Sequence, residues 1–249
     1  MNEQRNTQNG ENAKPQGFLA WLDNFWYHYK WHSIVALFLV LTVTICSVQM
    51  CQKESFDVYI LYAGSHEIER QSSTADMPEY QKSKSSLSRV TADLNGDGKV
   101  SLSLKDLFIL SEEEILEIEG RDDGTEVNYS LLSQNTKILQ DTMVYSSYYL
   151  CFLSPSVYED YKAYKEVKMF ASLSELVNDG TEVSYYAEDA ILLSSTGFYS
   201  LPGICELPED TLICLRSISD YASHMNKADA KREFNSAKDV ITKIINYKK

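Results

Sequence analysis

An uninterrupted apolar segment near the start of the chain constrains this sequence more than any other feature. From Ser33 to Gln52 the sequence SIVALFLVLTVTICSVQMCQ contains no charged residue. Twenty residues at 1.5 Å per residue give a helix of ~30 Å, which matches the hydrocarbon core of a bilayer. The segment lacks the polar stripe of a core helix, and its exit at residues 47–50 is unlike a signal-peptide cleavage site. The sequence therefore predicts an uncleaved signal-anchor helix over residues 33–52.

The segment before this helix, residues 18–32, is strongly aromatic. It holds all three Trp of the chain, Trp21, Trp26 and Trp31. Indole rings favour the membrane–water interface, where the ring is in an apolar layer and its N–H is hydrated. We therefore expect this segment to be interfacial. A groove on a partner helix is the alternative environment for it.

Basic residues on the two sides of the apolar segment predict its orientation. Lys14 and Lys30 precede it, whereas Lys53 is the only Lys or Arg among the first ~15 residues on the other side. Because cytoplasmic flanks carry the excess of Lys and Arg, the N-terminus should be cytoplasmic. We expect residues 1–17 to form a disordered cytoplasmic tail and residues 53–249 an extracytoplasmic domain of a single-pass cell-membrane protein.

The formal net charge of −13 is concentrated in the second part of the chain. Residues 1–50 contain three basic and three acidic side chains, so the whole excess lies in residues 51–249. An acidic domain repels phosphate backbones, since nucleic-acid binding depends on Lys and Arg. The charge therefore argues against a nucleic-acid partner.

Residues 53–249 alternate strand-like and helix-like segments. Runs of β-branched and aromatic residues indicate buried strands, and Ser or Asn before a periodic apolar pattern indicates the start of a helix. Strands are expected at 56–63, 100–104, 147–153, 190–194 and 211–215, and helices at 79–90, from 111 onward, and at 131–143, 155–165, 172–177 and 226–247. This alternation predicts an α/β domain with a mixed, partly parallel sheet.

Two motifs in this domain carry a family resemblance. YLCFLSPSVYEDY at 149–161 is a strand, a Ser/Pro turn and a helix, and SLSELV follows at 172–177. After an opening strand, this succession resembles the extracellular solute-binding proteins of bacteria, of the periplasmic binding protein type II class. With FWYHYKWH before its single span, the whole chain is similar to uncharacterised membrane-anchored proteins of Gram-positive bacteria. The resemblance implies a tethered outer domain that binds a solute.

The sequence DLNGDGKVS at 93–101 matches the start of a calcium-binding loop. Its candidate oxygen ligands, spaced two residues apart, are Asp93, Asn95, Asp97, Lys99 through its carbonyl, and Ser101. The closing carboxylate is missing, because Leu104 stands at position 12 of the loop. The loop is compatible with a weak calcium site or with a tight hairpin turn. No other cofactor is predicted.

Catalytic motifs are missing from the sequence. GxSxG, SxxK, HExxH and GxxxxGK[ST] do not occur in it. Tyrosine is the more suggestive excess, since 15 of 17 follow the apolar segment. Tyrosines in a cleft would suit a sugar or peptide ligand, whereas Tyr158, Tyr161 and Tyr164, spaced by three, favour packing of a helix against the sheet. The glutamates within residues 112–119 are interpreted as a solvated helix face.

These features predict a membrane-tethered, non-catalytic binding or accessory protein outside the cytoplasm. Its predicted partners are the membrane and either a sugar or peptide ligand or a membrane-protein partner. The alternative is a structural or interaction subunit of an envelope complex without a small ligand, and an envelope hydrolase is less favoured. The pairing of Cys205 with Cys214 is left open by the sequence.

Overall fold

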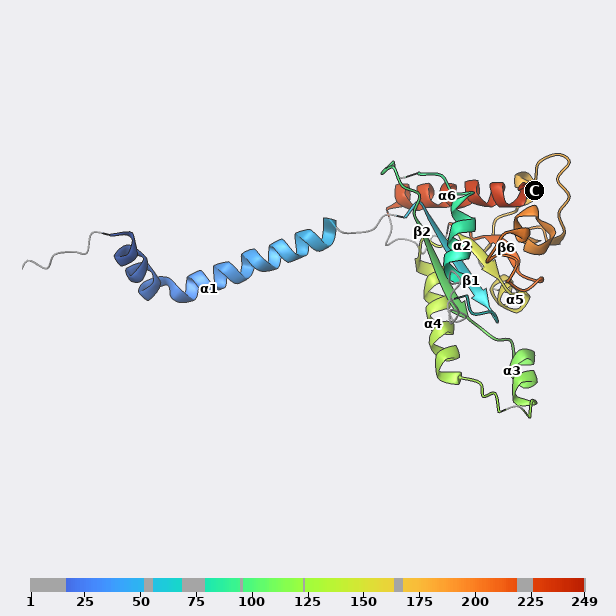
Figure 1. The fold of residues 1–249 in the computed structure, drawn as a ribbon, viewed down its shortest axis with the longest axis horizontal. Coiled ribbons are helices and arrows are strands. Elements are labelled where there is room, and N and C mark those ends of the chain that lie inside the picture. Colours follow the sequence, from blue (N-terminus) through green and yellow to red (C-terminus); the bar gives the residue numbers. More distant parts are fainter. Residues whose placement is uncertain are drawn as a thin grey trace, which may run out of the picture. The chain divides into compact units, whose positions relative to one another are not determined.

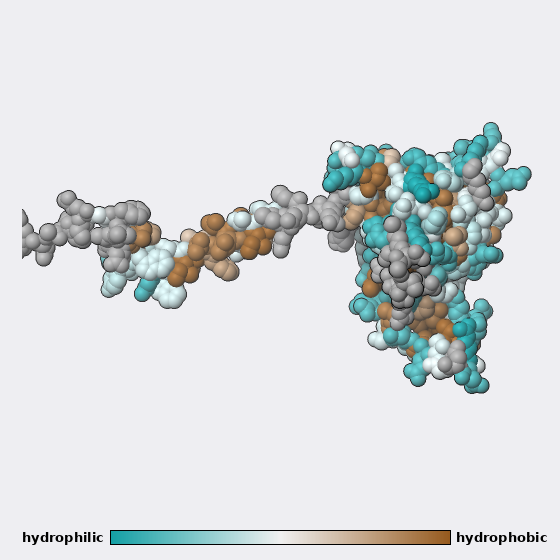
Figure 2. Space-filling model, viewed as in Figure 1, coloured by the Kyte–Doolittle hydropathy of each residue, from teal (hydrophilic) through white to brown (hydrophobic). Residues whose placement is uncertain are grey.

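Helix α1 (Phe18–Cys51) runs through the aromatic and the apolar segments as one helix of 34 residues in the computed structural model. The structure describes residues 17–51, 56–68, 79–94, 96–122, 124–163, 168–218 and 226–248. Within α1, Phe25–Ser47 is apolar and long enough to cross a membrane, and none of it is buried. A membrane anchor and a signal sequence share this length and composition. Figure 2 shows apolar side chains along the second half of α1.

Three hydroxyl side chains in the second half of this apolar stretch are satisfied by the helix itself. The hydroxyls of Thr42, Thr44 and Ser47 each donate to the carbonyl four residues earlier, at 2.8–2.9 Å. In a bilayer such internal bonds replace the missing water. These hydroxyls therefore do not oppose insertion of α1 into lipid.

Aromatic side chains line the first half of α1. Trp21 stacks on Phe25 with 5.6 Å between ring centroids, and Phe25 stacks on Tyr29 at 5.3 Å. The side chains of Trp21, Trp26 and Trp31 are all exposed. The helix thus presents its aromatic rings outward.

The chain divides into two compact units, residues 1–54 and 55–249, and the second contains a six-stranded sheet. In spatial order the strands are β2 (Leu102–Phe108), β1 (Val58–Gly64), β3 (Leu150–Leu153), β6 (Leu212–Leu215), β5 (Ala190–Leu192) and β4 (Tyr185–Ala187). Strand β1 pairs in parallel with β2 and β3, and the other pairs are antiparallel. The predicted α/β class with a partly parallel sheet is confirmed.

Helices cover both faces of this sheet. On one face, α2 (Glu79–Ser88) and α6 (Lys227–Ile245) pack on alternate strand residues such as Ile60, Phe152 and Ile213. On the other face, α4 (Tyr129–Tyr145) and α5 (Pro155–Lys162) pack on the intervening residues, such as Leu61 and Cys151. Side chains of successive strand residues point to opposite faces, so the two apolar cores interleave along each strand.

Helix α3 (Glu112–Glu119) differs from the other helices of the folded unit. It follows β2, and Figure 1 shows it standing apart from the sheet at one end of this unit. None of its residues is buried. Three short 3-10 turns complete the described elements: η1 (Ser174–Leu176), η2 (Leu193–Ser195) and η3 (Gly197–Ser200).

Three of the helix starts predicted from the sequence are confirmed, whereas the helix expected at 172–177 is only the 3-10 turn η1. Ser111 is the N-cap of α3, Ser154 caps α5 with Pro155 in its first turn, and Asn226 caps α6. Each cap side chain accepts a hydrogen bond from a backbone N–H of the first turn. Local side-chain chemistry therefore sets these boundaries.

Two strand predictions need correction. The strand expected at 100–104 is β2, Leu102–Phe108, and it continues through Lys105 and Asp106. These side chains fit the strand because Lys105 Nζ lies 4.5 Å from the centroid of the Tyr148 ring, and Asp106 accepts from the N–H of Ile68 at 2.7 Å. The edge strand β4 was not expected at all. Its three residues carry no alternating apolar pattern.

Candidate functional site

A cleft of about 450 Å³ opens at the carboxyl ends of β1 and β3. Its described lining comes from several separate segments: Tyr62 and Ser65 of β1 and its exit, Ser111, Glu113, Glu114 and Glu117 of α3, Ser154, Pro155, Ser156 and Glu159 of α5, Tyr186 of β4, and Pro208, Asp210 and Thr211 before β6. Elements that are far apart in sequence thus converge on one concave surface.

The topology explains why a cleft forms at this position. From β1 the chain crosses to β2 on one side, with α2 on one sheet face, and then from β2 to β3 on the other side of β1, with α4 on the opposite face. The connections leaving β1 and β3 therefore diverge, and a crevice opens between them. In open α/β sheets ligands bind at such a switch point, outside the carboxyl ends of the strands.

The floor of the cleft depends on Gly64. An added Cβ at this position would lie 2.8 Å from Tyr62 Oη and 3.4 Å from Ser154 Cβ. Only a residue without a side chain lets the Tyr62 phenol fold over the end of β1 beside the start of α5. At the same level the N–H of Ser154 donates to the carbonyl of Ala63 at 2.9 Å. The ends of β1 and β3 are thus fixed relative to each other.

The first turns of two helices border the cleft. In α5, Ser154 Oγ accepts from the N–H of Val157 at 3.4 Å and shares a 3.0 Å hydrogen bond with Ser156 Oγ. In α3, Ser111 and Glu114 form a capping box, in which Ser111 Oγ accepts from Glu114 N and Glu114 Oε2 accepts from Ser111 N. Helix N-termini carry roughly half a positive charge each.

Carboxylates dominate the charge of the cleft. Five acidic side chains line it, namely Glu113, Glu114, Glu117, Glu159 and Asp210, and the described lining includes no Lys, Arg or His. Two helix N-termini offset about one of these five charges. The cleft therefore carries a negative potential.

Tyr62 places a neutral hydroxyl in the negative electrostatic potential of the cleft. Its side chain is 1% exposed, and Oη accepts from the N–H of His66 at 3.3 Å. Burial holds the pKa of this phenol well above its usual range, and the carboxylates of Asp106, Asp210 and Glu114 raise it further. The hydroxyl therefore keeps its proton, and among the described residues no acceptor receives it.

A group of aromatic residues stands beside the cleft. Tyr158 stacks on Phe170 at 5.3 Å and meets Tyr186 edge-on at 5.6 Å between ring centroids. The Tyr158 hydroxyl donates to Asp189 at 2.5 Å. Burial raises the pKa of Tyr186, and the nearby Glu159 carboxylate raises it further. Tyr186 is thus a neutral, partly exposed ring at the edge of the cleft.

The sequence prediction for the tyrosines is confirmed in part. Tyr158 and Tyr161 are buried and pack in the α5 core, as expected from their spacing, whereas Tyr164 lies outside the described residues. Only Tyr62 and Tyr186 line the cleft among the described residues. The glutamates of α3 are largely exposed, as the sequence predicts, and three of them also line the cleft. No pattern within residues 112–119 indicates this second property.

The calcium-like loop is folded by its own hydrogen bonds. The two carboxylate oxygens of Asp93 accept from the N–H groups of Gly96 and Gly98 at 2.7 and 2.9 Å, and Asp97 accepts from the N–H of Lys99 at 2.8 Å. Both glycines have positive φ, 76° and 83°, which the turn requires.

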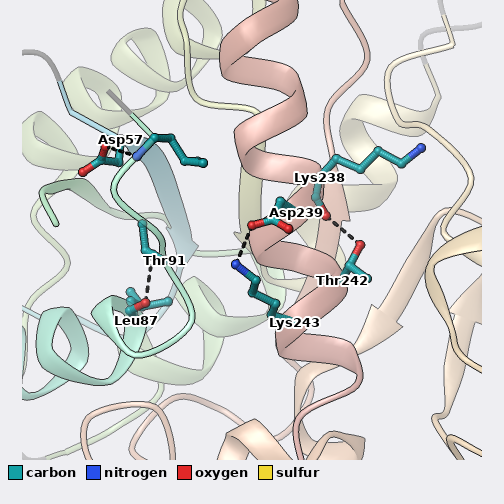
Figure 3. Close-up of polar contacts among 8 residues, drawn as sticks. Asp57, Leu87, Thr91, Lys238, Asp239, Thr242 and Lys243 are labelled. Carbon is teal, nitrogen blue, oxygen red and sulfur yellow. Dashed lines mark hydrogen bonds and ion pairs between the residues drawn. The ribbon is translucent and has the colours of Figure 1, made fainter. Parts of the chain in front are cut away.

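Asp57 closes this loop at its base. Its carboxylate accepts from Leu94 N at 2.8 Å and from Ser101 N at 2.7 Å, and Figure 3 shows it beside the strand end. Ser101 is therefore held to Asp57. Asn95 lies outside the described residues, and among the described residues no three His, Cys, Asp or Glu side chains gather around a common metal position. Calcium binding by this loop stays a prediction.

Cys205 and Cys214 are both free in the structure, and they lie in different environments. Cys205 is exposed, whereas Cys151 and Cys214 face each other as buried neighbours on β3 and β6. Burial raises the pKa of the Cys151 thiol to about 12. Such a thiol is an inert core residue, because the thiolate is the reactive form.

A second hollow, of about 500 Å³, lies along α6. Its lining consists of Leu94 and six residues of one helix: Ala228, Lys231, Arg232, Asn235, Ser236 and Asp239. Figure 3 shows Asp239 on α6 bonded to Lys243, at 2.6 Å. This hollow is a groove beside a single helix, without the convergence of strand ends seen at the first cleft.

Comparisons of this chain with protein-family models, with curated proteins and with solved structures found no match.

Proposed function

We propose that this protein is a membrane-tethered, non-catalytic binding or accessory protein. Its extracytoplasmic domain takes a small ligand in the cleft at the carboxyl ends of β1 and β3, in the manner of a solute-binding protein. The observation that carries this proposal is the position of the cleft, which lies at the topological switch point of the sheet.

The tether rests on the properties of α1. Its apolar stretch is exposed and long enough for a bilayer, and its three Trp side chains are exposed at or near the N-terminal end of that stretch. Lys14 and Lys30 precede the uncharged segment 33–52, which supports a cytoplasmic N-terminus. The exit of the stretch is a poor cleavage site, which supports an anchor that is retained.

The chemistry of the cleft supports binding without catalysis. A serine nucleophile needs a neighbouring base, and the described lining supplies hydroxyls and carboxylates but no imidazole or amine. The Ser154 hydroxyl is already engaged by Val157 N and Ser156. The Ser154 side chain therefore acts as the N-cap of α5.

A ligand screen with a blocked cleft tests this function. Full-length protein in phosphatidylcholine nanodiscs would be screened by thermal shift against sugars, short peptides and divalent ions. A ligand that raises the melting temperature of the wild type should have no effect on Ser65→Trp, which fills the cleft. Ser133→Trp, on the exposed side of α4, is the matched control and should respond like the wild type.

If no compound stabilises the wild type, or if Ser65→Trp responds as fully as Ser133→Trp, the binding function is wrong. The first of these results would favour the alternative of a structural subunit without a small ligand.

A further inference from the structure

We infer that the ligand of this cleft is a short basic peptide, whose ammonium or guanidinium groups meet the carboxylates and whose backbone carbonyl accepts from Tyr62. The inference rests on the proposed binding function and names the chemical class of its ligand. Its evidence is the charge, the spacing and the hydrogen-bonding state of the described lining.

Charge gives the first part of the argument. The lining combines five carboxylates with no basic side chain among the described residues. The N-termini of α3 and α5 together contribute roughly one positive charge, and Arg121, which lies outside the lining, pairs with Glu117 at 2.7 Å, so about three negative charges remain uncompensated. An anionic ligand would be repelled, and a neutral sugar would leave these charges without partners.

The spacing of the carboxylates gives the second part. Among the described residues, no three acidic side chains come close enough to one another to hold a single metal ion. The five carboxylates are instead spread over α3, α5 and the segment before β6. A spread set suits several separate cationic groups on one ligand better than it suits one divalent ion.

Tyr62 gives an independent third part. It is 1% exposed, lines the cleft, and accepts one hydrogen bond, from the N–H of His66. Its own proton has no acceptor among the described residues. A buried donor without an acceptor is unfavourable, so the ligand should supply one. A peptide carbonyl does this, whereas a fully protonated polyamine has no acceptor.

The test compares four probes on the full-length protein in phosphatidylcholine nanodiscs, with empty nanodiscs as the blank. Tri-lysine should bind at least about tenfold tighter than tri-alanine, and tri-glutamate should not bind. Spermidine, which has the charge but no carbonyl, should bind more weakly than tri-lysine. Raising the salt concentration from 50 to 500 mM should weaken tri-lysine binding, because screening reduces attraction between partly exposed charges.

Two cleft variants and one matched control show which residues contribute to binding. Glu113→Gln with Glu117→Gln removes two cleft charges and should weaken tri-lysine binding by about tenfold, since an exposed pair is worth up to about fivefold. Glu112→Gln with Glu182→Gln removes two exposed charges outside the cleft and should change it by less than about twofold. Tyr62→Phe should weaken tri-lysine binding by about three- to tenfold and leave spermidine binding unchanged.

The outcomes separate this inference from the function beneath it. If tri-alanine binds as tightly as tri-lysine, or if a neutral sugar alone occupies the cleft, the basic-peptide class is wrong and the binding function stands. If spermidine equals tri-lysine and Tyr62→Phe has no effect, the ligand is a polyamine and the peptide assignment is overturned. If no probe and no screened compound binds, the proposed function itself fails.

Discussion

At the scale of single residues, the buried guanidinium of Arg216 organises one end of the sheet. Its Nε donates to the carbonyl of Tyr148 at 3.1 Å, Nη1 donates to Met143 at 2.9 Å, and Nη2 donates to Ser146. Met143 and Ser146 belong to the end of α4, whose last carbonyls have no partner within the helix. Arg216, which directly follows β6, thus caps the C-terminal end of α4.

We predict that Arg216→Met lowers the free energy of unfolding by at least about 3 kcal/mol, because three carbonyl groups lose their donor. Arg216→Lys should recover little of this, since an ammonium cannot reproduce the planar set of donors. Urea denaturation measures both effects. The exposed control Arg121→Met should stay within about 0.5 kcal/mol of the wild type. A similarly small change in Arg216→Met would contradict the capping role.

Calcium binding by the loop at residues 93–101 also depends on single side chains. The loop lacks a closing carboxylate, so affinity should lie in the weak range of ~10⁻⁴–10⁻³ M. Free calcium at ~10 times the dissociation constant would add about 1.4 kcal/mol and raise the melting temperature by about 3–5 °C.

Asp97→Asn is the informative variant for this loop. Its amide oxygen can still accept from Lys99 N, as Asp97 does at 2.8 Å, so the turn is kept while a charge is removed. Asp93→Asn is less suitable, because both oxygens of Asp93 accept backbone N–H groups. Asp97→Asn should abolish the calcium shift. A wild type that shows no shift in millimolar calcium would leave the loop as a turn only.

At the scale of elements, α3 is expected to be the least stable helix of the folded unit. It has no buried residue, and Leu116 is 67% exposed. Its start depends on the capping box of Ser111 and Glu114. We predict that amides of α3 exchange with solvent faster than those of α4, whose Leu139 and Met143 lie in the core.

Ser111→Ala should increase exchange in α3 by about fivefold, because loss of an N-cap costs ~1 kcal/mol. Hydrogen exchange with mass spectrometry measures this on the whole chain. Exchange in α4 should not change and serves as the internal control. Equal effects on both helices would show that Ser111 stabilises the fold as a whole.

Elements with strong local signals could be predicted from the sequence. Ser111, the pair Ser154-Pro155 and Asn226 mark helix starts by hydrogen bonds within one turn, so no tertiary information is needed. The course of β2 could not be predicted past Leu104, because Lys105 and Asp106 are accommodated by Tyr148 and by the N–H of Ile68. These contacts come from distant parts of the chain.

The cleft could not be predicted for a related reason. The Ser154-Pro155 turn is visible in the sequence, but its position beside Tyr62 follows from the strand order β2-β1-β3. Glu113 and Glu117 reach the same cleft only because β2 lies on the other side of β1. Strand order depends on the packing of the whole sheet, which no local pattern encodes.

At the scale of the whole molecule, membrane topology makes a direct prediction. Cys205 is exposed, so a membrane-impermeant maleimide should label it on intact cells, and Cys205→Ser should lose this label. In that background, a cysteine introduced by Asn9→Cys should react only after permeabilisation. The membrane fraction should retain the full 28.4 kDa chain, as an uncleaved anchor requires. Labelling at position 9 from outside would reverse the orientation.

Hydrogen exchange on the full-length protein in nanodiscs, with and without saturating tri-lysine, tests the central claim most directly. Bound peptide should slow exchange in residues 111–117, 154–159 and 208–211, which surround the cleft at the ends of β1 and β3. Exchange along residues 228–239, beside the second hollow, should stay the same. Slower exchange confined to residues 228–239 would contradict the account, because the ligand would then occupy the α6 groove and leave the switch-point cleft empty.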